Sequence, residues 1–270
     1  MVVFRSDPCG IFCILLTYGA VFYADYVVTV QIVMPTMSNS LWGAFNAVLF
    51  NVILTMMLAS HLRAVLSDPG VVPLPKTNLD FSDLHSGSRS PIHQSGHDWT
   101  VCARCETYRP PRAHHCRICR RCIRRMDHHC PWINNCVGEY NQKYFLQFII
   151  YVGIASVHAI VLVAVAWLGD CDGCQLDEHS KQTMLMHCII LVIESLLFGI
   201  FVVAIMVDQL TAIWTDETAV EQVQRRGPHR PLKSKMALLQ EVFGRGSLAF
   251  WLLPCHSPPK EIEPHDDYTV

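Results

Sequence analysis

Apolar and polar positions alternate along the chain in long blocks: four hydrophobic stretches stand between polar segments. The hydrophobic stretches cover about Ile11–Met34, Leu41–Leu66, Tyr144–Leu168 and Met184–Leu210. Each reaches the roughly 20 residues that an α-helix needs to cross a bilayer. Asp25 and Glu194 interrupt the first and fourth. An acid within a span is a functional candidate, but for Asp25 we favour a position near the far interface or a pair inside the bundle.

These blocks predict an all-α membrane protein with four transmembrane helices and a small polar domain between the second and third. We expect tight turns at residues 35–40 and at Ser67-Asp68-Pro69-Gly70, where proline and glycine end a helix. The predicted segments are 1–10, an N-terminal segment; 11–66, helices 1 and 2; 67–143, a polar loop; 144–211, helices 3 and 4; and 212–270, a tail. Composition agrees, because 51% of residues are hydrophobic and 16% are charged.

Lysine and arginine predict the orientation of the spans. The loop 67–144 carries eleven of the 21 basic residues and the tail carries seven, whereas the loops 35–40 and 169–182 carry only Lys181. Basic loops stay in the cytosol, so both termini and the loop 67–143 are expected there. A reducing cytosol also keeps thiols available to metals. Cys171 and Cys174 would lie on the opposite side, as a disulfide or as free thiols.

The polar loop contains a dense group of metal ligands, with its core at residues 100–138. Seven of the thirteen cysteines and four histidines fall between Cys102 and Cys136. Cysteines three positions apart are typical of zinc sites. Two closed tetrahedral sites need eight ligands, so three of these eleven groups remain for other chemistry. Apart from this crowding we see no internal repeat.

Two interpretations of this segment stay open from spacing alone. It could be a purely structural zinc module that binds a partner. Alternatively, Asp127, His128 and Cys130 place an acid, an imidazole and a thiol within four residues, which is the grouping that activates a thiol nucleophile. The position of this group just before a membrane span favours the second interpretation, since a reactive thiol would then lie at the bilayer surface.

The motif that runs from Cys102 to Gly138, including Asp127-His128-His129-Cys130, resembles the DHHC cysteine-rich domain of the membrane protein S-acyltransferases, or palmitoyltransferases. The chain is most similar to the short Golgi-type members. The resemblance implies two structural Zn²⁺ ions and a free thiol, Cys130. One ion would be held by Cys102, Cys105, His115 and Cys122, and the other by Cys116, Cys119, His129 and Cys136.

The resemblance further implies a protein-cysteine S-palmitoyltransferase that uses acyl-CoA as co-substrate. Cys130 would carry the acyl group, His128 would be its base and Asp127 would orient His128. Eight arginines lie between Arg104 and Arg125; they could attract CoA phosphates and anionic lipid or merely set topology. Trp132, Arg124 and Arg125 are the acyl-CoA-binding candidates, with Phe148 and Tyr151 as further candidates for the acyl cavity.

Two positions depart from the family pattern, which commonly reads Thr-Thr-x-Glu after the fourth span and has an asparagine four residues before Val-Phe-Gly. Here these places hold Ala219 and Leu238. They keep open an alternative function, a zinc-stabilised membrane scaffold or weakly active relative. Expected partners are long-chain acyl-CoA, the lipid bilayer and membrane-associated proteins with cytosolic cysteines, not nucleic acid. Tyr268-Thr269-Val270 could add a strand to a PDZ-type groove, and the resemblance implies Golgi membranes.

Overall fold

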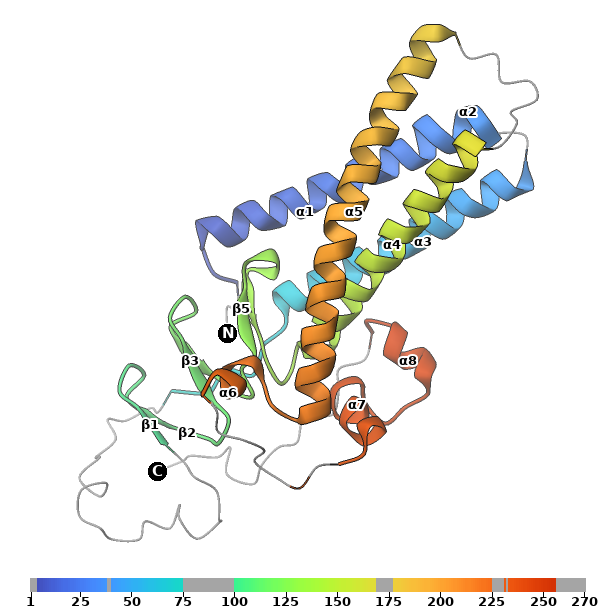
Figure 1. Cartoon of the computed structure of the whole chain (residues 1–270). Helices are drawn as coiled ribbons and strands as arrows, with labels where there is room; N and C mark the ends of the chain where they lie inside the picture. Colours follow the sequence, from blue (N-terminus) through green and yellow to red (C-terminus); the bar gives the residue numbers. More distant parts are fainter. Residues whose placement is uncertain are drawn as a thin grey trace, which may run out of the picture.

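A computed structural model describes residues 4–37, 40–74, 100–168, 177–224, 231 and 233–255. It confirms a mostly helical chain with four helical stretches long and apolar enough to span a membrane: Pro8–Met37, Leu41–Leu66, Gln142–Leu168 and Glu178–Thr215. The chain is therefore a multi-pass membrane protein. Figure 1 shows the long helices gathered at one end and the short strands at the other. Cys171, Cys174 and the final residues Tyr268–Val270 lie outside the described residues.

The first span is built from three helical pieces. Helix α1 (Pro8–Tyr26) continues as a π-helix (Val27–Val33) and then as α2 (Met34–Met37). The tight turn predicted from residue 35 was therefore placed too early. Pro35 is the second residue of α2, and the described helical run ends two residues after it, at Met37. Asp7 caps the start of α1 by accepting from the backbone N–H of Gly10 at 2.9 Å.

The other spans are the single helices α3 (Leu41–Leu66), α4 (Gln142–Leu168) and α5 (Glu178–Thr215). Phe50, Leu162 and Leu191 are fully buried where they pack. A polar contact joins two spans, because Nε2 of His158 lies 2.9 Å from Oδ1 of Asn46. Helix α5 begins and ends outside the predicted apolar stretch, since Asp177 caps its polar first turn and its last turns carry contacts to the cysteine-rich segment.

Three antiparallel hairpins lie between α3 and α4. They pair β1 (Thr100–Cys102) with β2 (Thr107–Arg109), β3 (His114–Cys116) with β4 (Arg121–Ile123), and β5 (His128–Cys130) with β6 (Asn135–Val137). A short 3₁₀ helix (Pro131–Ile133) occupies the third turn. Strands of three residues bury little apolar surface, so such a segment needs another source of stability.

The tail folds back on the helices through α6 (Ala219–Gln224), α7 (Lys235–Phe243) and α8 (Leu248–Leu252). One face of α4 holds the end of α8. Lys143, Gln147 and Tyr151 donate to the backbone carbonyls of Phe250, Trp251 and Leu252, at 3.0, 2.8 and 2.8 Å. These donors satisfy carbonyls that the end of a helix leaves without partners, and they fix the tail beside the membrane helices.

Candidate active site and metal centres

The three hairpins form a 14-residue repeat, which corrects the expectation that the chain has none. Their first strands begin at residues 100, 114 and 128, and their second strands at 107, 121 and 135. Each first strand ends in a cysteine, and four residues later each turn has a left-handed residue, with φ of 48°, 52° and 47° at Glu106, Arg120 and Asn134. Apart from cysteines and the His-His-Cys that begins the second and third units, few side chains recur, so the repeat is weak in the sequence.

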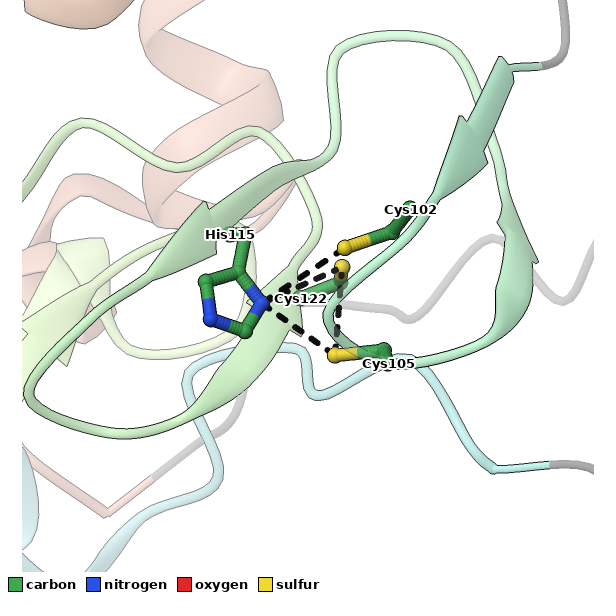
Figure 2. A group of neighbouring side chains, drawn as sticks. All are labelled: Cys102, Cys105, His115 and Cys122. Atoms are coloured by element: carbon green, nitrogen blue, oxygen red, sulfur yellow. Dashed lines mark hydrogen bonds between the residues drawn. The ribbon is translucent and has the colours of Figure 1, made fainter.

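The first metal cluster joins the first two hairpins. Cys102 ends β1 and Cys105 lies in the following turn, whereas His115 and Cys122 are directly opposed in the next hairpin. Figure 2 shows the three sulfur atoms around Nδ1 of His115. Their distances from that nitrogen are 3.6 Å for Cys102, 3.2 Å for Cys105 and 4.0 Å for Cys122.

The second cluster repeats this arrangement between the second and third hairpins. Cys116 ends β3, Cys119 lies in its turn, and His129 opposes Cys136 in the third hairpin. The three sulfur atoms lie 3.8, 3.4 and 3.7 Å from Nδ1 of His129, in the order Cys116, Cys119 and Cys136. Each cluster is thus a clamp that holds two successive hairpins together.

Both clusters fit zinc. Tetrahedral zinc with bonds of about 2.3 Å to sulfur and about 2.0 Å to nitrogen holds its ligand atoms about 3.5 to 3.8 Å apart. The sulfur atoms of Cys105 and Cys122 are 3.7 Å apart, and those of Cys119 and Cys136 are 3.4 Å apart. Within each cluster all four ligand atoms lie within 4.8 Å of one another. Three thiols and one imidazole are the donor set of closed, structural zinc sites.

In the third hairpin Cys130 occupies the position that Cys102 and Cys116 occupy in the first two. Cys102 and Cys116 each belong to a metal cluster. The second cysteine of the motif is missing from the third hairpin, because Ile133 stands where Cys105 and Cys119 stand in the others. The chain then enters α4 at Gln142. Cys130 therefore belongs to neither cluster. It is buried, with 4% of its surface exposed.

Asp127 and His128 form a pair beside this thiol. Oδ2 of Asp127 lies 2.7 Å from Nδ1 of His128, and the imidazole also interacts with the side chain of Cys130. Burial lowers the pKa of His128, but the hydrogen bonds and charges of Asp127 and Cys130 outweigh burial and raise the pKa to about 9. Burial also opposes ionisation of Asp127, yet its hydrogen bond and charge interaction with His128 hold the pKa of this carboxyl below its usual value.

An apolar cavity extends from Cys130 between all four spans. Its walls include side chains from α1, α3, α4 and α5, such as Thr17, Phe50, Phe148 and Phe201. Trp132 lines it and packs edge-on against Phe198. Tyr151 is not part of its lining, since its hydroxyl binds the tail. The structure therefore brings a thiol, an acid–imidazole pair and an apolar chamber together.

The two arginines predicted to bind acyl-CoA lie at the end of the second hairpin. Arg125 pairs with Asp216 at 3.2 Å and with Glu241 at 3.7 Å, and both carboxylates belong to the part of the chain that follows the fourth apolar stretch. The backbone of Arg124 bonds to Gly70, which follows α3. Arg125 thus joins the cysteine-rich segment to the tail, a role that its sequence position did not indicate.

A buried ion pair also joins the cysteine-rich segment to the tail, through Arg112, which precedes β3. Arg112 donates to both carboxylate oxygens of Glu221, at 2.8 and 2.9 Å, and to Asp216 at 3.0 Å. Thr218 and Glu221 form a capping box at the start of α6, in which Glu221 accepts from the N–H of Thr218 at 2.8 Å. The spacing Thr-x-x-Glu is a sequence signal for this cap, but it does not reveal the arginine.

Comparisons with known proteins agree with this geometry. A family model described as DHHC palmitoyltransferase matches residues 95–226. Palmitoyltransferase ZDHHC3 of Homo sapiens is 38% identical over 257 residues, which cover 94% of this chain and 84% of that protein. Palmitoyltransferase ZDHHC7 of Mus musculus is 37% identical, with coverages of 93% and 80%, and Probable protein S-acyltransferase 12 of Arabidopsis thaliana is 30% identical, with coverages of 92% and 88%. The chain belongs to the DHHC palmitoyltransferase family.

Proposed function

We propose that this membrane palmitoyltransferase moves a long-chain acyl group from acyl-CoA to cysteines of substrate proteins through a thioester on Cys130. One observation carries the proposal: the buried thiol of Cys130 lies between the Asp127–His128 pair and an apolar cavity lined by all four spans. The thiol can thus be activated from one side while the acyl chain is held on the other.

In the first step the Cys130 thiolate attacks the thioester carbonyl of acyl-CoA. His128 holds the proton that left the thiol and gives it to the departing CoA sulfur, so that CoA leaves as a thiol. The raised pKa of His128 favours the imidazolium that pairs with the thiolate. Asp127 accepts from Nδ1 of His128, which leaves Nε2 for the proton transfers.

In the second step a substrate thiol attacks the acyl group on Cys130. His128 takes the proton of the incoming thiol, and Cys130 leaves as a thiolate. One thioester is exchanged for another in each step, so the protein has to activate thiols and position them rather than overcome an unfavourable equilibrium. The bilayer helps to position the substrate thiol, because membrane-associated substrates carry their cysteines close to the surface where Cys130 lies.

The two metal clusters are proposed to hold structural zinc, with Cys102, Cys105, His115 and Cys122 at one ion and Cys116, Cys119, His129 and Cys136 at the other. Bound zinc would supply the folding stability that three-residue strands cannot. Of the acyl-CoA-binding candidates, Trp132 lines the cavity, and Arg124 stays a candidate for the CoA phosphates. Arg125 is a weaker candidate, because two carboxylates already compensate its charge.

We also propose that both termini and the hairpins face the cytosol, in an endomembrane such as the Golgi. The distribution of lysine and arginine supports this orientation. The division into an N-terminal segment, two pairs of spans, a zinc-binding loop and a tail follows from it. Tags at each terminus, probed with protease on sealed vesicles, test the topology, and fluorescence microscopy of the tagged chain tests the organelle.

Incubation of the purified chain with labelled palmitoyl-CoA tests the reaction. We expect an adduct that hydroxylamine releases, that Cys130→Ser abolishes, and that passes its label to a cysteine-containing acceptor. A folded wild type with two zinc ions that takes up no label would instead support the scaffold alternative. Ala219 argues less for that alternative than its side chain suggests, because its backbone N–H donates to Oδ1 of Asp127 at 2.8 Å.

A further inference from the structure

The carboxylate of Asp127 is held by more than His128. The Asp127 side chain is almost completely buried, with 3% exposed. Its Oδ2 atom accepts from Nε2 of Gln209 at 2.6 Å, and its Oδ1 atom accepts from the Ala219 N–H at 2.8 Å. A buried carboxylate needs hydrogen-bond donors at both of its oxygen atoms, and Gln209 and Ala219 supply them beside His128.

Gln209 is well placed for this role. It lies near the end of α5, has 3% of its surface exposed, and its side chain reaches a carboxylate 82 positions away in the sequence. Its amide orientation is fixed from both ends, since Oε1 accepts from Nε2 of Gln142 at 3.4 Å. The reverse orientation would direct Oε1, which has only lone pairs, at the Asp127 carboxylate.

We propose that Gln209 is a positioning residue for the acyl transfer, acting through Asp127. Two donors on Oδ2 and one on Oδ1 fix the plane of the carboxylate, so that His128 is presented with Nδ1 toward Asp127 and Nε2 toward Cys130. The fourth span thus contributes to the reaction beyond lining the cavity. This inference rests on the proposed function, since it assigns a part in the reaction of Cys130.

A double-mutant cycle tests the proposal. Gln209→Leu and Gln209→Met remove the donor and keep an unbranched or similarly sized side chain, and each is made alone and together with Asp127→Ala. The rate of labelled adduct formation on Cys130 is measured in single turnover, with the zinc content of every variant. Gln222→Leu is the matched control, because Gln222 is exposed and its side chain donates to the backbone carbonyl of Glu217.

We expect both Gln209 variants to form the adduct about tenfold or more slowly, since they lose a hydrogen bond to a charged group. In the Asp127→Ala background the same changes should slow it less than about twofold, because residues that act through one partner are not additive. Two zinc ions per chain should remain. Wild-type rates in both Gln209 variants, or an equal loss in both backgrounds, would overturn the inference. The wild-type adduct tests the proposed function separately.

Discussion

Asn135 lies directly opposite Cys130 in the third hairpin, and its side chain ties that hairpin to the end of the second span. The amide of Asn135 donates to the backbone carbonyls of Ala64, Val65 and Ser67, at 3.2, 3.3 and 3.0 Å. Those carbonyls belong to the end of α3, where a helix has no internal donors for them. One buried side chain therefore caps a span and fixes the strand opposite Cys130 to the end of that span.

We predict that Asn135→Leu lowers the free energy of unfolding by about 1–3 kcal/mol, because carbonyls at the end of α3 lose a donor and that of Ala64 keeps the one from Asn141 at 3.4 Å. It should also slow adduct formation on Cys130, since the hairpin is no longer fixed to α3. Thermal unfolding in detergent and labelled palmitoyl-CoA measure the two effects. Asn51→Leu is the matched control: Asn51 is exposed, and its side chain donates to the carbonyl of Ala47 in its own helix. Equal effects of the two changes would contradict the predicted role of Asn135.

The separation of Cys130 from the metal clusters predicts zinc contents. Wild type and Cys130→Ser should each contain two zinc ions, because Cys130 belongs to neither cluster. Cys102→Ala should contain one, since its site would lose one of the four protein ligands of a closed structural zinc site. Atomic absorption on the purified variants gives the count. A zinc content that falls in Cys130→Ser would show that the thiol is a ligand and would refute the assignment.

The two clusters should differ in their importance for the reaction. The cluster of Cys119 includes His129 and Cys136, which come from the two strands of the third hairpin, whereas the cluster of Cys105 holds only the first and second hairpins together. Cys119→Ala should therefore abolish adduct formation, while Cys105→Ala should leave a measurable fraction. Single-turnover labelling of both variants, each with its zinc content, decides this. A greater loss in Cys105→Ala would contradict the order.

We predict that Glu221 contributes to the free energy of unfolding through its ion pair, which lies apart from the thiol of Cys130. Its side chain is fully buried and pairs with Arg112, whose side chain is 11% exposed. Breaking a buried pair on one side leaves a charge without compensation and costs about 3–5 kcal/mol. Because Asp216 also pairs with Arg112, we expect the loss in Glu221→Gln to be at the lower end of this range. The free energy of unfolding should fall by about 3 kcal/mol, which thermal unfolding measures. Glu178→Gln is the control, because its ion pair with Lys181 is exposed; similar losses would refute the prediction.

Local patterns in this sequence predicted what depends on local physics. A span needs only its own apolar length, and a zinc site with cysteines three positions apart needs only a turn, so both could be recognised residue by residue. The contacts that hold Asp127 could not. Gln209 and Ala219 lie 82 and 92 positions away from it, and nothing in their neighbourhood distinguishes them. At position 219 the sequence shows only the missing hydroxyl, whereas the contact to Asp127 is made by the backbone N–H.

That backbone contact gives the last prediction. Ala219 is the first residue of α6, after the cap at Thr218. Proline is favoured at the first helical position, where its fixed φ suits the helix and its missing N–H breaks no helical bond. Ala219→Pro should therefore preserve α6 but replace the donor to Oδ1 of Asp127 by the Cδ atom of proline, which displaces the carboxylate. We expect adduct formation about tenfold slower, because the lost bond is to a charged acceptor.

Ala219→Thr is the matched variant, since it restores the hydroxyl of the family pattern and keeps the N–H. If the N–H is what Asp127 needs, this variant should stay within about threefold of wild type. Both rates come from single-turnover labelling at equal zinc content. A large gain in Ala219→Thr together with no loss in Ala219→Pro would mean that the hydroxyl is the required group. In that case the chain would be a weakened relative of active family members, because the side chain that Asp127 required would be absent.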